Sequence, residues 1–273
     1  MSEFKATVLI DNIPNSGLEC EWGLSIHISY RGKNFLLDTG ASSRFLQNAE
    51  RLGIRMEDVD YGILSHAHYD HSDGMSAFFA ANAVSKFYLR NSSAENCYSK
   101  HGFFKKYIGI KKGTLHKYAE RIIYADGKYA LSDGVWLLPH TTEHLEEIGA
   151  KAKMYQKVSH RWKTDDFSHE QSLVFETEKG LVILNSCSHG GADNIISEVS
   201  AAFPNNPIYA MIGGFHLFRS SESDVLAFAN RVKDTGIEKV LTGHCTGQKA
   251  YDIMHQVLGE SLEQISSGFV FEI

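Results

Sequence analysis

Three histidines and a carboxylate lie within six positions of this chain, a density that few purposes other than metal binding explain. Residues 65–74 read SHAHYDHSDG and contain His66, His68, Asp70 and His71. In an extended segment, residues two apart point to the same side, so His66 and His68 can hold one ion together. Asp70 and His71 lie further round the turn, which suits a second ion. Such ligands are typical of zinc, with iron and manganese as alternatives. The alternative interpretation is a group of surface histidines on a polar loop.

The cluster lies between a predicted strand and a predicted helix. Residues 59–64 form a short apolar run that ends at the cluster. Downstream, apolar residues from Met75 onward recur at helical spacing behind a predicted cap formed by Ser72 and Asp73. We therefore expect the cluster on a strand-to-helix loop.

Residues 66–71, His-Ala-His-Tyr-Asp-His, resemble the HxHxDH signature of the metallo-β-lactamase superfamily. The resemblance implies an α+β fold, a four-layer αββα sandwich with a metal site at one edge. It implies little about the substrate.

Length and composition set the broad class of protein. With 273 residues, 43% of them hydrophobic, we expect residues 1–273 to form a single domain with a large core. The N-terminal residues lack the basic start and apolar stretch of a signal peptide, and no apolar run approaches a bilayer span, which predicts a cytoplasmic protein without membrane contact. The four cysteines show no CxxC pairing, which excludes a disulfide scaffold or a zinc ribbon. The net charge of −6 makes nucleic acid an unexpected partner.

A predicted hairpin in the first half ends in a conspicuous aspartate. Residues 25–30 and 35–37 form its strands, and Asp38-Thr39-Gly40 follows. The superfamily resemblance implies that Asp38 supports the metal site by holding its ligands. Asp38 can alternatively cap the helix predicted for residues 42–52.

The second half repeats the pattern of the first. Residues 172–177 and 181–185 form another predicted hairpin, and later strands also run into histidines. Two copies of a strand-rich half with outer helices are what a four-layer sandwich requires.

Residues 95–166 interrupt this regular alternation and are predicted to form an insertion over the mouth of the site. Seven basic residues and one acidic residue lie between positions 100 and 121, interleaved with aromatic residues. A basic, aromatic lid suits an anionic small-molecule substrate with a flat ring, and Lys105 and Lys106 are candidate substrate-binding residues. Alternatively, these lysines lie on a solvated helix face and contact only water.

Three more histidines follow short apolar runs in the second half, where small residues let the chain turn. They are His189 in NSCSHGG, His216 in GGFHL and His244 in TGHCTG. We assign His66, His68 and His189 to the first ion. Asp70, His71 and His244 are assigned to the second ion.

The chain departs from the usual superfamily pattern at two places. The third histidine usually precedes the second hairpin, where this chain has His169 and Glu170, and an aspartate that bridges both ions usually follows it, where this chain has Cys187. Cys187 can bridge as a thiolate, His189 can take that place, or the ions share only a hydroxide. Alternatively, Cys187 and Cys245 are small buried residues that fill space beside the ligands.

The motifs of the second half, together with residues 165–170, resemble one branch of the superfamily. That branch includes archaeal dihydropterin-methyl ribofuranosylaminobenzene phosphate synthases and related metal-dependent hydrolases. The resemblance implies an enzyme in which two divalent ions activate water against an ester, thioester or phosphoester. Asp70 would orient the water, and His216 would protonate the leaving group or bind a metal itself. The alternatives are a transferase that joins a pterin pyrophosphate to an aminobenzene ribosyl phosphate, and a metal-bound sensor without turnover.

Overall fold

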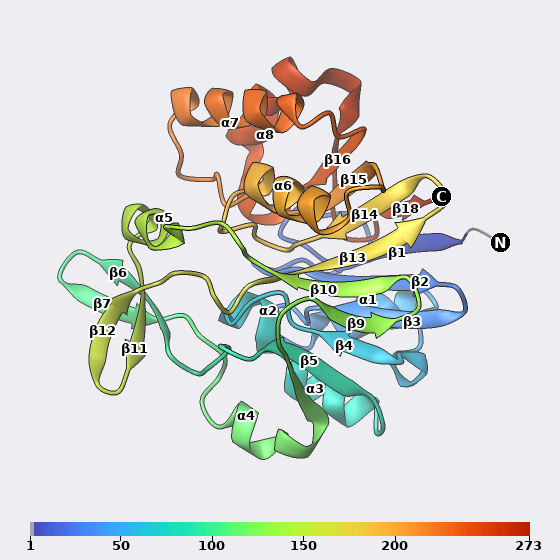
Figure 1. Cartoon of the computed structure of the whole chain (residues 1–273). Helices are drawn as coiled ribbons and strands as arrows, with labels where there is room; N and C mark the ends of the chain where they lie inside the picture. Colours follow the sequence, from blue (N-terminus) through green and yellow to red (C-terminus); the bar gives the residue numbers. More distant parts are fainter. Residues whose placement is uncertain (1–2) are drawn as a thin grey trace.

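Two seven-stranded sheets face each other at the centre of the computed structural model, which describes residues 3–273 (Figure 1). The first sheet has the order β18-β1-β2-β3-β4-β5-β8. Its strands are β1 (Phe4–Ile10), β2 (Ser25–Tyr30), β3 (Lys33–Leu37), β4 (Tyr61–Ile63), β5 (Lys86–Arg90), β8 (Ile122–Ala125) and β18 (Val270–Glu272). The second sheet has the order β17-β16-β15-β14-β13-β10-β9. Its strands are β9 (Tyr129–Ser132), β10 (Val135–Pro139), β13 (Gln171–Thr177), β14 (Gly180–Leu184), β15 (Ile208–Gly213), β16 (Lys239–Thr242) and β17 (Leu262–Gln264).

Helices cover the outer face of each large sheet (Figure 1). Against the first sheet lie α1 (Arg44–Arg51) and α3 (Met75–Ala81), with the short α2 (Tyr69–Ser72) beside them. Against the second sheet lie α6 (Ala192–Ala202), α7 (Glu222–Asp234) and α8 (Gln248–Leu258). Single 3-10 turns occur at Met56–Asp58, Ala119–Arg121, His244–Thr246 and Gly259–Ser261. This arrangement confirms the predicted α+β four-layer sandwich.

The apolar residues of β14 explain why the second sheet is covered on both sides. Val182 and Leu184 point into the core between the two sheets, whereas Leu181 and Ile183 pack beneath the helices. All five residues of the strand are buried. A strand buried on both faces reads as a continuous apolar run, and this run marks the centre of the sandwich.

Both halves of the chain use the same local topology. β2 and β3 are antiparallel and β4 then pairs parallel with β3, while β13 and β14 are antiparallel and β15 then pairs parallel with β14. β16 continues the parallel set. The carboxyl ends of these parallel strands therefore supply loops to one edge of the sandwich.

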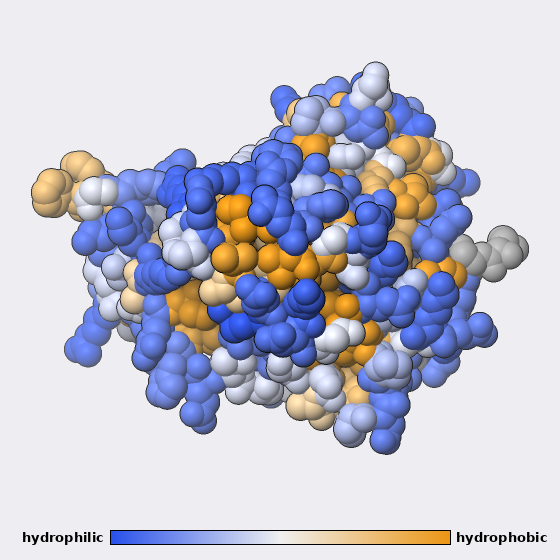
Figure 2. All heavy atoms as spheres, turned by 90° about the horizontal axis from the view of Figure 1, so that it is seen from above, coloured by the Kyte–Doolittle hydropathy of each residue, from blue (hydrophilic) through white to orange (hydrophobic). Residues whose placement is uncertain are grey.

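A four-stranded sheet, called here the small sheet, projects from one side of the sandwich (Figure 1, left). It consists of β6 (Cys97–His101), β7 (Phe104–Tyr107), β11 (Met154–Val158) and β12 (Arg161–Thr164), and α4 (Thr114–Lys117) and α5 (Leu145–Ala152) lie in the connections around it. Figure 2 shows an apolar projection at the left, the side on which the small sheet lies. In the hairpin between β6 and β7, Phe103 is 99% exposed. Residues 95–166 thus divide between the small sheet, its connections and strands β8 to β10 of the two large sheets.

The predicted cap of the helix after the histidine cluster is wrong. α3 begins at Met75 and is preceded by Gly74, with no side-chain cap among the described residues. The Ser72 hydroxyl instead donates to the carbonyl of His68, because residues 69–72 already form the separate turn α2.

Candidate metal centre

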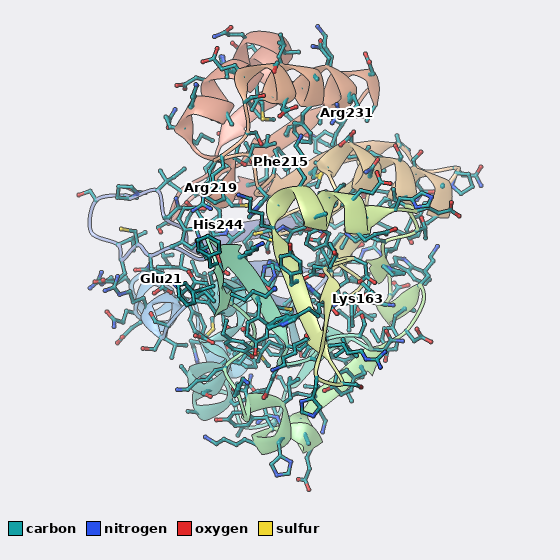
Figure 3. The ribbon with its side chains drawn as sticks, turned by 90° about the vertical axis from the view of Figure 1, so that its left-hand side faces the viewer. Glu21, Lys163, Phe215, Arg219, Arg231 and His244 are labelled. Atoms are coloured by element: carbon teal, nitrogen blue, oxygen red, sulfur yellow. The ribbon has the colours of Figure 1, made fainter. Side chains whose placement is uncertain are left out.

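The predicted ligands lie at the edge of the sandwich where the parallel strands end. His66 and His68 follow β4, His189 follows β14 and His244 follows β16. Figure 3 looks onto the side of the molecule from which the small sheet projects, with His244 and, in β12, Lys163 labelled.

The three residues assigned to the first ion converge in the structure. One potential ligand atom from each of His66, His68 and His189 lies within 4.8 Å of the others. All three side chains are buried, and within the described part of the chain each Nε2 has no hydrogen-bond partner. Because buried polar atoms are nearly always satisfied, three orphaned nitrogens that face one another fit a bound cation.

The surroundings of these imidazoles keep the rings in the neutral form. Burial lowers the pKa of His66, His68 and His189 well below the ordinary value, and burial also lowers the pKa of His244, to about 3. The rings are therefore neutral at physiological pH, which is the form that binds a metal.

The residues assigned to the second ion also lie together. Asp70 Oδ2 is 3.8 Å from His71 Nε2 and 3.7 Å from His244 Nε2. His244 is buried, and its Nε2 lacks a partner among residues 3–273. These donors fit a second cation beside the first set, since the His66 and His71 ring centroids are 4.2 Å apart.

Asp38 holds the histidine-rich loop in place. Its Oδ1 accepts the backbone N–H of Ser65 at 2.7 Å, and its Oδ2 accepts the Ser65 hydroxyl at 2.6 Å and His71 Nδ1–H at 2.8 Å. The bond to Nδ1 leaves His71 Nε2 directed toward the site. α1 is preceded by Ser43, so the alternative interpretation of Asp38 as a helix cap is wrong.

His169 orients the histidine-rich loop through hydrogen bonds of both ring nitrogens. Its Nδ1 accepts the backbone N–H of Ala67 at 3.1 Å, which requires the proton on Nε2. Nε2 is 3.2 Å from Asp165 Oδ2 and donates to it. Asp165 also accepts from Gln156 of β11 at 2.8 Å, so this network joins the small sheet to the segment between His66 and His68.

Glu170 fixes the loop that carries His189. Its carboxylate accepts the backbone N–H groups of His189 at 3.0 Å and Gly190 at 3.2 Å, and it also pairs with His140 Nε2. His140 Nδ1 lies 3.0 Å from Glu198 Oε2. Sequence reasoning missed His140 and Glu198, although His140 follows directly after β10, the same strand-end signal that identified the other histidines.

His216 and Cys187 lie beside both ligand sets. One potential ligand atom from each of Cys187, His189 and His216 lies within 4.8 Å of the others, and His216 Nδ1 is buried and unpartnered among the residues described. Cys187 Sγ is 3.2 Å from His71 Nε2. Burial raises the pKa of the Cys187 thiol, whereas a bound cation would deprotonate a coordinating thiol.

The two candidate substrate-binding lysines lie in the small sheet rather than among the ligands. Lys105 Nζ lies 4.7 Å from the Tyr155 ring centroid and 4.4 Å from that of Trp162. Its neighbour Lys106 is exposed, and successive strand residues point to opposite faces of the sheet. Residues 104–107 form a strand, not the helix face on which solvated lysines were an alternative.

Asp38→Asn is expected to weaken divalent-metal affinity by about 10–100-fold, because an amide cannot accept from Ser65 and His71 as the carboxylate does. Competition with a chromophoric chelator measures the affinity, and circular dichroism confirms folding. Asp133→Asn, at a side chain that is 99% exposed, is the matched control. Unchanged affinity in folded Asp38→Asn protein would contradict this role.

His140 is expected to make stability fall as pH rises. Burial acts to lower the pKa of His140, but Glu170 and Glu198 outweigh it and raise the pKa to about 10. A pKa raised above the unfolded value gives stability that is complete below about pH 6.5 and is lost as pH rises toward 10. Urea unfolding from pH 6 to 10 should show this decline in the wild type and a weaker one in His140→Gln. The exposed His144→Gln is the control, and equal slopes in all three proteins would refute the expectation.

Comparisons with known proteins agree with this architecture. A family model described as the metallo-beta-lactamase superfamily matches residues 23–154. A relative from Methanocaldococcus jannaschii, named 7,8-dihydropterin-6-methyl-4-(beta-D-ribofuranosyl)-aminobenzene-5'-phosphate synthase, is 30% identical over 94% of this chain and 92% of its own.

Solved structures of other proteins show the same fold. A crystal structure described as a metal-dependent hydrolase of the beta-lactamase superfamily has a TM-score of 0.85 and 28% identity, over 99% of both chains. The metallo-beta-lactamase fold protein YhfI from Bacillus subtilis has a TM-score of 0.60 at 14% identity over 100% of both chains, a similarity of fold alone. None of the helices in residues 3–273 is long and apolar enough to cross a membrane.

Proposed function

This chain belongs to the metallo-β-lactamase superfamily, and from that premise we propose that it is a hydrolase with two divalent ions, zinc first, with iron or manganese as alternatives. Its proposed substrate is an ester, thioester or phosphoester of an anionic small molecule. The observation that carries the proposal is the convergence of His66, His68 and His189, whose buried Nε2 atoms have no partner among the described residues. The equally unpartnered Nε2 of His244 lies 3.7 Å from Asp70 Oδ2.

The proposed ligands are those assigned above, three histidines for the first ion and Asp70, His71 and His244 for the second. When bound, divalent ions supply Lewis acidity that polarises a carbonyl or phosphoryl oxygen and makes water nucleophilic at neutral pH. Asp70, whose Oδ2 lies between His71 and His244, orients the attacking water. His216 donates a proton to the leaving group from the side next to His189, with ring centroids 4.4 Å apart.

The charge of the small sheet supports an anionic substrate. Its four strands, as the structure describes them, contain six lysine or arginine residues and no acidic residue. Positive charge beside a site attracts anions and raises their local concentration. The network from Asp165 to His169 places the base of this sheet next to His68, since the His68 and His169 ring centroids are 5.4 Å apart.

A transferase is the second candidate, favoured by the synthase name of the relative that is 30% identical. In that reaction a pterin pyrophosphate is joined to an aminobenzene ribosyl phosphate, and pyrophosphate departs. The same cationic surroundings suit an anionic leaving group.

A substrate panel separates these functions. Fully metallated protein is tested with phosphodiester, thioester and lactone substrates, and with a pterin diphosphate plus an aminobenzene acceptor. Hydrolysis supports the first proposal, and transfer supports the second. Asp70→Asn is expected to lower kcat/KM about a hundredfold or more, while Asp133→Asn leaves it unchanged. The absence of both activities would reject both proposals and favour a metal-bound sensor.

His216→Gln is expected to lower kcat about a hundredfold with little change in KM, because a proton donor acts in the transition state. The metal content, measured by mass spectrometry of dialysed protein, should stay at the wild-type level. A fall in metal content would show instead that His216 is a ligand.

A further inference from the structure

We propose that Cys187 is a thiolate ligand placed between the two ion positions, where the superfamily pattern has a bridging aspartate. The inference rests on the proposed two-ion centre and adds a sulfur ligand to it. It assigns a chemical role to a buried cysteine that would otherwise only fill space.

The position of Cys187 relative to both ligand sets is the first argument. A potential ligand atom of Cys187 lies within 4.8 Å of those of His66 and His71, which belong to different sets. Cys187 also groups in this way with His189 of the first set and with His244 of the second. An atom that approaches ligands of both ions from the centre is in the position of a bridge.

The contact with His71 shows where the Cys187 sulfur lies relative to the second ligand set. Cys187 Sγ lies 3.2 Å from His71 Nε2, and His71 Nδ1 is already committed to Asp38. The sulfur and Nε2 are thus close enough to bind one ion as adjacent ligands, with the ion to one side of the line that joins them. Cys187 is 2% exposed, so solvent does not compete for the sulfur.

Charge is the second argument. Among the assigned ligands only Asp70 is anionic, and two divalent ions in an enclosed site need further negative charge. Three neighbouring carboxylates are committed to other partners. Asp38 binds Ser65 and His71, Asp165 binds His169 and Gln156, and Glu170 binds backbone N–H groups and His140. A thiolate at Cys187 supplies the missing anion.

Cys245 supports the thiolate from the other side. Its Sγ is 3.4 Å from Cys187 Sγ and accepts the backbone N–H of His216 at 3.2 Å. Because a thiol that accepts one hydrogen bond can still donate another, the Cys245 S–H can donate to a Cys187 thiolate. Cys245 then acts as a positioning residue.

Metal coordination by Cys187 would replace its S–H bond with a sulfur–metal bond. The Cys187 S–H bond is lost, a sulfur–metal bond forms, and the proton leaves to solvent without any change of oxidation state. A soft thiolate favours zinc or iron over manganese, so the assignment also narrows the choice of metal.

X-ray absorption of the zinc-loaded full chain tests the proposal. The wild type is expected to show a sulfur shell at about 2.3 Å from zinc. Cys187→Ser should lose this shell, and Cys187→Asp should lose it while it keeps about two zinc ions per chain by restoring a carboxylate. Circular dichroism establishes that each variant is folded.

Controls separate the possible results. Cys20→Ser and Cys245→Ser should keep the sulfur shell. Zinc-loaded wild type without a sulfur shell, or a shell that survives in Cys187→Ser and disappears in Cys245→Ser, overturns the assignment of Cys187 and leaves the two-ion centre intact. Folded wild type that takes up no zinc overturns the proposed function itself.

Discussion

The buried carboxylate of Asp38 is the interaction on which the candidate site depends. It joins the end of β3 to the loop after β4 through Ser65 and His71, all of them buried. Thr39 strengthens the connection, because its N–H and its hydroxyl both reach the carbonyl of His71. Without this connection, the histidine-rich loop would lose the hydrogen bonds that fix Ser65 and His71.

The backbone also indicates that the site is held in shape by its surroundings. Non-glycine residues rarely adopt positive φ, and such conformations persist only when neighbouring contacts enforce them. Several non-glycine residues with positive φ lie in or beside the site: Asp38, Phe167, Ser188, His216 and His244. Asp38, Ser188, His216 and His244, or the backbone groups beside them, take part in the contacts described above, so packing and hydrogen bonds maintain the strained conformations that aim these side chains.

Much of the fold and part of the site were predictable from the sequence, for identifiable physical reasons. The apolar runs of the two hairpins and the local spacing of His66, His68, Asp70 and His71 are short-range patterns, and they predicted the hairpins and the central cluster. The resemblance to the superfamily implied the four-layer sandwich. His189 and His244 were found because each follows a strand and a small residue. The role of His169 was not predictable, because it depends on the Ala67 N–H, 102 positions away. Glu198 was missed for the same reason, since 58 positions separate it from His140. His140 itself follows directly after a strand, a signal that was available in the sequence. The predicted cap at Ser72 and Asp73 was wrong because the Ser72 hydroxyl donates to the carbonyl of His68 at the turn α2.

The small sheet is joined to the histidine-rich loop near its base. Just after β7, the Tyr69 backbone N–H donates to the carbonyl of Ile108 and His68 pairs with Gly109. The hairpin tip of this sheet, where Phe103 and Phe104 are exposed to solvent, lies outside these contacts. The tip can therefore differ in length or in side chains without any change to the hydrogen bonds at the base. The surface that the tip offers to solvent and the geometry of the histidine-rich loop are thus structurally independent of each other.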